Sequence, residues 1–311
     1  MLPFVNILIP AYKKTFLEQT LKSLLSQTYQ NFCIYIIDDC SPFHLKTIID
    51  SLSSNKLIYI RNEKNLGKKD LVANWNKALS YIDGDLIVLA SDDDLYDANF
   101  LDTLVKLSLK YPSVDLFHCR VAVINDKNKP IYWGPSIAEY ETDIDFIYQR
   151  SINRRTQLIS DFMFRRRAIE KIGGFVSYPL AWYSDEMTLY KLAQGKGVVC
   201  AQETLFYWRS SLENISSKND DTLQKADASF QHMEKMRLLI ENLFPKNPKD
   251  IFLLSQLRSR FDIAIKRQLI NDMIKSSHRI NSKIFKKYHK YFTFREKTIF
   301  RIERFRRRLN F

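Results

Sequence analysis

The N-terminal third of the chain alternates between short apolar runs and longer segments in which apolar residues recur at helical spacing. The apolar runs are residues 5–9 (VNILI), 33–37 (CIYII), 56–60 (KLIYI) and 85–90 (DLIVLA). Between the first two runs, Leu17, Leu21 and Leu24 fall on one face of a helix. Strands that are apolar throughout and alternate with helices are typical of a parallel sheet covered by helices on both faces. This pattern predicts an α/β fold with a mostly parallel sheet.

The second half of the chain is less regular. Residues 114–124 (VDLFHCRVAVI) predict a longer strand, and the NDKNKP that follows predicts a hairpin turn. A helical segment ends at Gly173 and Gly174, because glycine suits the left-handed conformation that closes many helices. Beyond this point the pattern becomes helical and increasingly basic. We expect a sheet domain over residues 1–215, with halves at 1–100 and 101–215, and a basic α-helical C-terminal region over residues 216–311.

The composition is that of a folded protein, since 45% of the 311 residues are hydrophobic and 27% are charged. No uninterrupted apolar run approaches the roughly 18 residues that a membrane-spanning helix needs. The first residues, MLPFVNILIPAY, include two prolines and no basic n-region, so we do not expect a signal peptide. The four cysteines have no metal-ligand spacing, which favours reduced thiols in a cytoplasmic protein.

The net charge of +13 is concentrated near the C-terminal end. Residues 276–311 contain twelve Lys or Arg and two Glu, a net charge of +10. Apolar residues such as Ile302 and Phe305 recur there at helical spacing. A basic amphipathic helix suits an anionic membrane surface, so we expect peripheral contact with the inner face of a membrane. The alternative is a solvated helix that packs its apolar stripe on the protein body. Nucleic-acid binding is not expected, because no binding module is recognisable.

Polar residues follow the predicted strands at the points where they end. These ends are Pro10 to Tyr12, Asp38 with Asp39, and Asp92 to Asp94. In open parallel sheets, ligands bind outside the carboxyl ends of the strands. We therefore expect an aromatic ring and two acidic clusters to converge on one crevice.

The usual phosphate-binding glycines are missing from this crevice. The seven glycines stand at positions 67, 84, 134, 173, 174, 195 and 197, and none follows the first strand. The sequence contains neither GxGxxG nor GxxxxGK(S/T), which disfavours a dehydrogenase or a P-loop enzyme. Another means of holding a diphosphate is a divalent cation, Mn²⁺ or Mg²⁺, bound by Asp92, Asp93 and Asp94. Alternatively, these three acids begin a loop and cap the next helix.

Several segments, taken in order, resemble a known family. They resemble the nucleotide-sugar-binding half of the bacterial, inverting family-2 glycosyltransferases of GT-A fold. The segments are ILIPAYKKTFLEQTLKSLLSQTYQNFCIYIIDDCSP, RNEKNLGKKDLVANWNKAL and LASDDDLYDANFL. The resemblance continues through FMFRRRAIEKIGGF and WYSDEMTLYKLAQGKGVV and covers about residues 3–216. It implies a Rossmann-like, mostly parallel sheet with helices on both faces.

The resemblance implies a set of donor-binding residues. Asp92 matches an acid near the ribose, and Asp93 and Asp94 match acids that hold Mn²⁺ or Mg²⁺. The other positions that match nucleotide contacts of the family are Pro10, Ala11, Tyr12, Asp38, Asp39, Asn65, Gly67 and Lys68.

The resemblance also implies a catalytic base. Asp185 matches the acid at the start of a helix that removes the proton from the attacking hydroxyl group in this family. Without the resemblance, Asp185 is interpreted as a helix N-cap. The residues expected at the acceptor are Gly173, Gly174, Phe175, Trp182, Tyr183 and Glu186.

Four positions depart from the family pattern. Ala90 stands where an acid often precedes the serine of the DSDD-type motif, which leaves Asp92 to Asp94 to hold the metal alone. Cys40 stands where glycine is common, and Ser184 replaces the Glu that is common before Asp185. No histidine occupies the position of a late metal ligand, and Arg209 is a candidate contact of the diphosphate instead.

The function that the resemblance implies is metal-dependent, inverting transfer of a sugar from a nucleoside-diphosphate sugar. We expect a UDP-sugar as donor, a saccharide or lipid-linked hydroxyl as acceptor, and a role in surface polysaccharide biosynthesis. One alternative is a sugar-phosphate nucleotidyltransferase, which would normally carry a basic phosphate-binding loop where only Lys13 and Lys14 stand. The other is a non-catalytic carbohydrate- or membrane-binding module, which has no need for acids at three separate functional positions.

Overall fold

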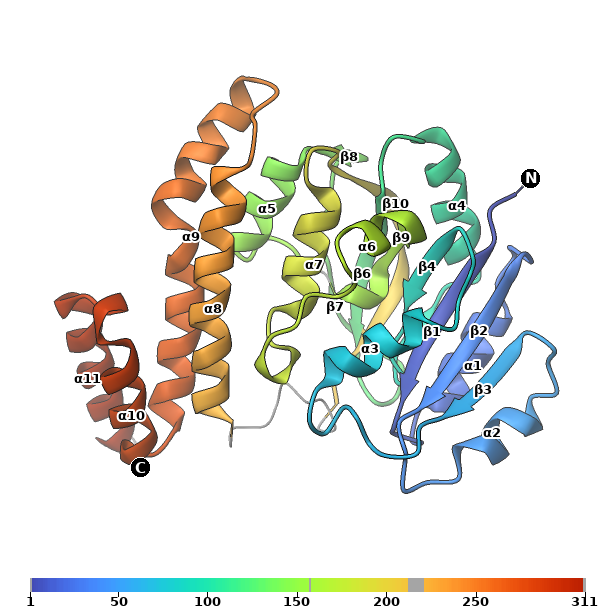
Figure 1. Cartoon of the computed structure of the whole chain (residues 1–311), viewed down its shortest axis with the longest axis horizontal. Helices are drawn as coiled ribbons and strands as arrows, with labels where there is room; N and C mark the ends of the chain where they lie inside the picture. The colour runs from blue at the N-terminus through green and yellow to red at the C-terminus, as the bar shows by residue number, and fades with distance from the viewer. Residues whose placement is uncertain (1, 157, 212–220, 310–311) are drawn as a thin grey trace.

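A computed structural model describes residues 2–156, 158–211 and 221–309 of the protein. A sheet of ten strands lies at the centre of these described ranges (Figure 1). The strands are β1 (Val5–Ala11), β2 (Phe32–Asp38), β3 (Leu57–Arg61), β4 (Leu86–Leu89), β5 (Leu95–Tyr96), β6 (Leu116–Ile124), β7 (Pro130–Trp133), β8 (Tyr140–Glu141), β9 (Phe162–Arg165) and β10 (Val198–Arg209).

The sheet is mixed, in the order β3-β2-β1-β4-β9-β6-β10-β5. The first four of these strands are parallel, and so are β6 and β10. Strand β9 runs antiparallel between β4 and β6, and the hairpin of β6 and β7 follows the predicted turn. The carboxyl ends of β1, β2 and β4 therefore meet at one edge of the sheet, where the predicted crevice lies.

Helices cover both faces of this sheet. One face carries α1 (Leu17–Leu25), α2 (Leu45–Ser51) and α4 (Phe100–Lys110), and the other carries α3 (Leu71–Leu79), α5 (Asp143–Ser151), α6 (Arg166–Lys171) and α7 (Ser184–Ala193). Alternation along β1 explains why two cores form. Val5, Ile7 and Ile9 join the core beneath α1, while Leu8 points to the opposite face and joins the other. The predicted α/β fold, with helices on both faces, is confirmed.

Residues 136–165, which the sequence pattern leaves unassigned, hold β8, α5, a short 3-10 turn (Ile159–Asp161) and β9. Thr142 caps the N-terminus of α5, because its side chain accepts a hydrogen bond from the backbone N–H of Asp145. Phe162 and Phe164 of β9 are fully buried and extend the core between β4 and β6.

In the described part of the C-terminal region the α-helices are α8 (Thr222–Glu241), α9 (Pro248–Lys275), α10 (His278–Tyr288) and α11 (Phe294–Leu309). Met236 of α8 and Leu253 of α9 are buried in the same core as α5 and α7. Helices α10 and α11 lie outermost (Figure 1) and pack Ile284 and Phe300 on the ends of α8 and α9. The predicted boundary at residue 215 falls in segment 212–220, outside the described residues. Among the helices that the structure describes, none has the length and apolarity to cross a bilayer.

Candidate functional site

Two adjoining cavities lie at the carboxyl-end edge of the sheet. The first, of about 520 Å³, has walls from the ends of β1 and β4 and from α3; we name it the strand-end cavity. The second, of about 330 Å³, lies beside the start of α7; we name it the helix-end cavity. Both are lined by Leu71, Trp75, Ser91, Asp93, Ile159 and Ser160. The shared lining makes the two cavities parts of one crevice.

Asp92 ties the end of β4 to the end of β1. Its Oδ2 accepts hydrogen bonds from the backbone N–H groups of Tyr12 (2.9 Å) and Lys13 (2.8 Å). The ammonium group of Lys13 contacts Asp93 and lies 3.4 Å from Asp92 Oδ1. Burial lowers the pKa of Lys13, but the charges of Asp92 and Asp93 outweigh burial and leave the pKa raised. Lys13 therefore neutralises part of the acidic cluster in this structure.

The three consecutive aspartates have different surroundings. Asp94 Oδ1 accepts a hydrogen bond from Arg209 N (2.8 Å), and its Oδ2 accepts one from Ser91. Burial, helped by the neighbouring charge of Asp93, raises the pKa of Asp94 to about 7. Asp92 lines only the strand-end cavity and Asp94 only the helix-end cavity, whereas Asp93 lines both. Asp93 is thus the acid of the cluster that both parts of the crevice share.

The acidic cluster fits a divalent cation only if the ligand supplies further oxygens. No group of three or more His, Cys, Asp or Glu that could hold a metal occurs among the described residues. Both oxygens of Asp94 already accept hydrogen bonds from the protein, whereas the Asp93 carboxylate and Asp92 Oδ1 face the ammonium group of Lys13. One or two carboxylates completed by phosphate oxygens are a common way of binding Mg²⁺. The donor set therefore fits a cation that arrives with a diphosphate.

Asp39 holds the loop that leads to α3. Its Oδ1 accepts hydrogen bonds from Asn62 Nδ2 and Leu66 N, both 2.8 Å, and its Oδ2 accepts one from Gly67 N at 2.6 Å. A Cβ atom on Gly67 would lie 2.9 Å from Asp39 Oδ2, so this close approach requires glycine. Asn65 Oδ1 accepts a hydrogen bond from Lys68 N (2.7 Å) in the same loop.

Asp38 is buried next to this loop. Its carboxylate accepts hydrogen bonds from Ser41 N (2.7 Å) and Tyr59 Oη (2.5 Å) and pairs with Arg61. Cys40, which follows Asp39, adopts the left-handed conformation that favours glycine, with φ 54°. The turn therefore has a glycine-like backbone although the residue is cysteine.

The predicted donor residues thus fall into two groups. Pro10, Tyr12, Asp92 and Asp93 line the strand-end cavity. The others lie behind its wall or beside it and brace the backbone: Ala11, Asp38, Asp39, Asn65, Gly67 and Lys68.

Asp185 and Glu186 begin α7 and face different surroundings. Asp185 lines the helix-end cavity, and Arg150 Nη2 lies 3.5 Å from its Oδ2. Burial raises the pKa of Asp185 in spite of the opposing charge of Arg150. Glu186 Oε1 is 3.1 Å from His232 Nε2, and Arg150 Nε is 3.4 Å from Glu186 Oε2. Burial alone would raise the pKa of Glu186, but the hydrogen bond with His232 and the charge of Arg150 lower it to about 2.

The segment before α7 has an unusual backbone. Leu180, Ala181 and Tyr183 have φ angles of 60°, 57° and 70°, which only glycine adopts without strain. These residues and Trp182 line the helix-end cavity. Left-handed residues of this kind persist where the surrounding structure holds them, and they gather at functional sites.

The predicted acceptor residues do not all reach the crevice. Trp182 and Tyr183 line the helix-end cavity, but Phe175 is only 3% exposed and packs edge-on against Trp75. Gly174 lies against Asn76, whose Oδ1 would be 2.5 Å from a Cβ at this position, and Gly173 has a left-handed φ of 82° that closes α6. Gly174 and Phe175 therefore pack on Asn76 and Trp75 of α3, and neither lines the strand-end or helix-end cavity.

The expected contact of Arg209 with a diphosphate is also corrected. Its Nε donates to the backbone carbonyl of Asp93 (2.7 Å), and its Nη1 donates to Asn128 Oδ1 (2.6 Å). The guanidinium group lies 4.0 Å from the centre of the Phe16 ring. Arg209 is fully buried and anchors the acidic segment instead of facing the crevice.

Several residues of the site have no sequence signal. Arg150 and His232 reach Asp185 and Glu186 from α5 and α8, and only the tertiary packing brings them there. Trp75 lines both cavities, yet its helical spacing in the sequence is that of an ordinary core residue. Lys13 is different, because its position directly after Tyr12 places a cation beside the predicted crevice and could have indicated its role.

Comparison with known proteins gives a consistent result. Residues 6–173, more than half of the chain, match the sequence model of the family described as Glycosyl transferase family 2. WcaA of Escherichia coli K12, a glycosyl transferase whose name refers to colanic acid biosynthesis, is 30% identical over 106 residues, which are 33% of this chain and 37% of WcaA. WfgD of Escherichia coli is named a UDP-Glc:alpha-D-GlcNAc-diphosphoundecaprenol beta-1,3-glucosyltransferase. It is 26% identical over 125 residues, 40% of this chain and 48% of WfgD. The matches span about a third to a half of the length of these curated relatives.

Solved structures share the fold at low sequence identity. Residues 1–349 of Staphylococcus aureus TarS, in complex with UDP-GlcNAc, have a TM-score of 0.60 at 15% identity, covering 90% of this chain and 83% of that one. The mannosyltransferase PcManGT of Pyrobaculum calidifontis, in complex with GDP-Man and Mn²⁺, has a TM-score of 0.55 at 16% identity, covering 96% and 84%. The predicted GT-A fold is confirmed by these likenesses.

Proposed function

Because the chain belongs to glycosyl transferase family 2, we propose that it transfers a sugar from a nucleoside-diphosphate sugar to a hydroxyl group, with inversion at the anomeric carbon. One observation carries this proposal. Asp93 lines both adjoining cavities, and Asp185 lines the helix-end cavity beside it. A donor whose diphosphate lies at Asp93 would direct its sugar toward the cavity that holds Asp185.

The strand-end cavity suits a nucleotide. Tyr12, Phe43 and Trp75 supply aromatic faces, and Lys14 supplies positive charge for phosphates. We propose that Pro10 and Tyr12 lie along the base, with the buried Ala11 supporting them from behind, and that Asp92 lies near the ribose. The loop held by Asp39 would support them from behind. UDP is the nucleotide we propose, because the donor named for WfgD is UDP-Glc and TarS binds UDP-GlcNAc.

The proposed metal, Mn²⁺ or Mg²⁺, would be held by Asp93, with Asp92 Oδ1 beside it, and by oxygens of the diphosphate. When bound, a divalent cation neutralises the charge that develops on a leaving diphosphate. PcManGT supports this proposal, because its structure contains Mn²⁺ with the nucleotide sugar. Asp94 is not retained as a ligand, since both its oxygens accept hydrogen bonds from the protein.

The proposed reaction is a direct displacement. The acceptor oxygen forms a bond to the anomeric carbon while the bond from that carbon to the diphosphate oxygen breaks, and the nucleoside diphosphate leaves. Asp185 takes the proton of the acceptor hydroxyl as general base. Its raised pKa makes the ionised carboxylate a better proton acceptor than an ordinary aspartate. Trp182 and Tyr183 would bound the acceptor sugar.

We propose that the acceptor is a saccharide or a lipid-linked saccharide and that the product belongs to a surface polysaccharide. WcaA and WfgD, whose names refer to colanic acid and to a diphosphoundecaprenol acceptor, support this proposal. The basic C-terminal helices would bring the protein to an anionic membrane surface on the cytoplasmic side, where such acceptors lie.

A donor screen tests the proposal. Purified protein is incubated with each of a panel of UDP-, GDP- and dTDP-sugars, with Mn²⁺ or with EDTA, and thermal unfolding and release of nucleoside diphosphate are measured. We expect one class of nucleotide sugar to raise Tm in the presence of Mn²⁺ and to be slowly hydrolysed. Neither stabilisation nor hydrolysis by any member of the panel would refute the proposal.

A further inference from the structure

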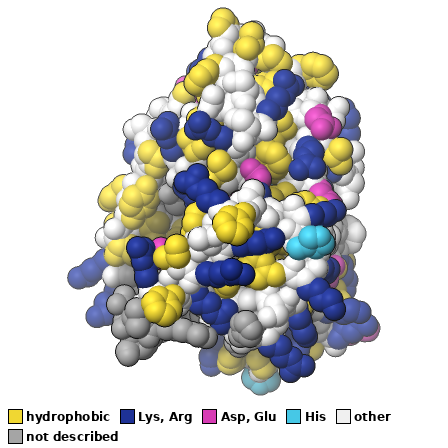
Figure 2. Space-filling model, turned by 90° about the vertical axis from the view of Figure 1, so that its left-hand side faces the viewer, with side chains coloured by type: hydrophobic (Ala, Val, Ile, Leu, Met, Phe, Trp, Pro, Cys, Tyr) yellow, Lys and Arg dark blue, Asp and Glu magenta, His cyan; other side chains and the backbone are white. Residues whose placement is uncertain are grey.

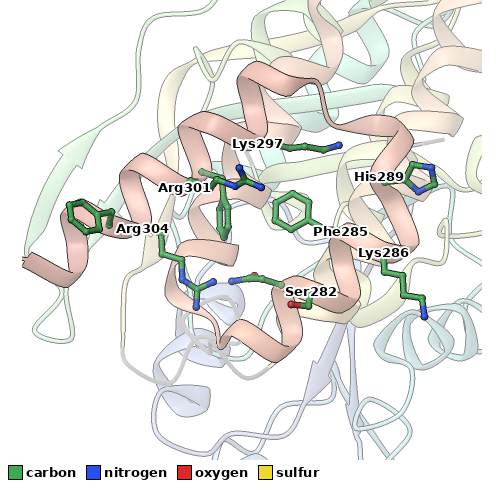
Figure 3. Close-up of a pocket in the computed structure, with 10 residues that line it drawn as sticks. Ser282, Phe285, Lys286, His289, Lys297, Arg301 and Arg304 are labelled. Atoms are coloured by element: carbon green, nitrogen blue, oxygen red, sulfur yellow. The ribbon is translucent and has the colours of Figure 1, made fainter.

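A third cavity lies in the C-terminal region, between α10 and α11. Its volume is about 630 Å³, and it shares no lining residue with the strand-end or helix-end cavity. Phe285, Phe300 and Phe305 give it an apolar lining. Figure 3 shows the Phe285 ring in the middle of the lining side chains and Arg304 reaching from α11 toward Ser282 of α10. We name this cavity the C-terminal groove.

Positive charge surrounds the apolar lining. Lys286, Lys297, Arg301 and Arg304 line the groove, together with His289, and no Asp or Glu does. None of the four Lys and Arg side chains has an ion pair with any residue in the part of the chain that the structure describes. The groove is therefore a cationic site with an apolar base.

Other cations of the C-terminal helices are neutralised. Lys266 of α9 lies 2.9 Å from Asp262 and 3.4 Å from Glu296, and Lys287, which follows a groove residue in sequence, lies 3.0 Å from Asp227. Acidic partners are therefore present in this region, but the structure gives none of them an ion pair with a Lys or Arg of the groove among the described residues. Clustered cations that lack acidic partners repel one another and favour an anionic ligand.

Helix α11 also exposes apolar side chains on its outer surface. Phe294 is 85% exposed, and Ile299 and Ile302 are also exposed. Figure 2 shows the corresponding side of the molecule, where Lys and Arg side chains spread over the surface with hydrophobic side chains between them and few acids. Apolar side chains flanked by basic ones are the composition of helices that lie in a membrane interface.

We propose that the C-terminal groove binds a single phospholipid. Lys297, Arg301 and Arg304 hold its phosphate, and the first part of its hydrocarbon chain lies against Phe285 and Phe300. Free phosphate would leave the apolar lining unused, and a nucleic acid needs an extended track of cations, which a groove confined to two short helices does not offer. The inference rests on the proposed contact of this region with an anionic membrane, and it adds a saturable site to that contact.

Matched variants separate the groove from general surface charge. The groove variant is Lys297→Gln with Arg301→Gln; the control is Lys283→Gln with Lys290→Gln, two exposed residues of the same region outside the groove lining. Both variants remove the same charge. The first assay measures co-sedimentation of the full chain with phosphatidylcholine vesicles, with and without phosphatidylglycerol. The second measures titration of soluble dihexanoyl phosphatidic acid, with dihexanoyl phosphatidylcholine and inorganic phosphate as comparisons.

We expect saturable binding of one phosphatidic acid, much weaker binding of inorganic phosphate, and a loss of affinity of at least about ten-fold in the groove variant. The control variant should weaken vesicle binding, as any loss of surface charge does, but should leave the phosphatidic acid affinity unchanged.

Three outcomes would overturn the inference. Equal loss of phosphatidic acid affinity in the two variants would contradict a lipid site in the groove, but it would leave the proposed contact with the membrane surface in place. If the unmodified protein binds neither the vesicles nor the soluble phosphatidic acid, both the groove site and the membrane contact are contradicted. Tighter binding of a single-stranded RNA oligonucleotide, abolished in the groove variant, would replace the lipid by a nucleic acid. Nucleotide-sugar hydrolysis should be unchanged in both variants, so that none of these outcomes bears on glycosyl transfer.

Discussion

Asp185 and Glu186 are adjacent in sequence, yet Asp185 lines the crevice that contains Asp93 while Glu186 is held by His232 in a separate small cavity. Successive residues of a helix point in directions about 100° apart, which explains the divergence. The two carboxyl groups also differ in pKa, raised for Asp185 and lowered to about 2 for Glu186. Pairs of acids with such separated pKa values commonly have separate roles.

Asp185→Asn should remove sugar transfer while leaving donor binding intact. Loss of a general base costs about 10²- to 10⁴-fold in rate. Glu186→Gln is the matched control, because it changes the neighbouring acid in the same way but alters a group that does not line the helix-end cavity. Transfer rate and nucleotide affinity are measured for both variants. Retained turnover in Asp185→Asn, or equal losses in both, would contradict the base assignment.

The pH dependence of transfer should depend on Arg150. As a base, Asp185 acts only when ionised, so the rate should rise with pH through its raised pKa. The charge of Arg150 opposes this rise in pKa, so Arg150→Gln should raise the pKa further and move the acid limb of the rate profile to higher pH. The profile is compared with that of the unmodified protein after circular dichroism confirms folding. An unchanged acid limb would contradict the coupling.

His232 should couple the C-terminal region to the start of α7. It is fully buried, contacts Glu186, and stacks on Tyr183 with ring centres 4.3 Å apart. His232→Ala should lower the free energy of unfolding by about 1–3 kcal/mol, because it leaves polar groups of the pair without their partner. Combined with Glu186→Gln, the loss should be smaller than the sum of the two single losses. Denaturant unfolding of the three variants measures this coupling, and additive losses would show that the contact is energetically unimportant.

Asp94 should make stability depend on pH. Its pKa of about 7 lies above the ordinary value of 3.8, so the folded protein binds this proton more tightly than the unfolded chain. The associated stabilisation is full below the ordinary value and is lost as the pH rises through about 7. Asp94→Asn stays neutral throughout and should therefore gain stability relative to the unmodified protein over this range. Thermal unfolding in EDTA at several pH values measures the difference. A difference that does not vary with pH would contradict the raised pKa.

The sheet was predictable because its signals are local. The runs at β1, β2 and β4 are apolar on both faces, which only a covered parallel sheet explains. The C-terminal end of β1 was less predictable, because the strand continues past Pro10 to Ala11. Proline is tolerated there because β4 pairs with β1 only as far as Leu8, so Pro10 interrupts no hydrogen bond between these two strands. Helix α5 was missed because Asp143 and Asp145, although buried, break its apolar pattern.

The site was predictable only where motif residues themselves line the crevice, as Tyr12, Asp93 and Asp185 do. Motif matching did not separate them from residues that support the crevice from behind, such as Phe175, because facing direction depends on packing. Motif matching also cannot predict contacts between segments that are distant in sequence. His232 stands 46 positions from Glu186, and nothing in the intervening sequence indicates that the two side chains pair.

The central claim is that the crevice binds a nucleoside diphosphate with a divalent cation at Asp93, and calorimetric titration of UDP tests it most directly. UDP is titrated into the unmodified protein, Asp93→Asn and the surface control Asp102→Asn, each with Mn²⁺ and with EDTA. We predict Mn²⁺-dependent binding to the unmodified protein and to Asp102→Asn, and a loss of about two orders of magnitude in affinity in Asp93→Asn. Binding that is equally tight in Asp93→Asn, or that is unaffected by removal of Mn²⁺, would contradict the account.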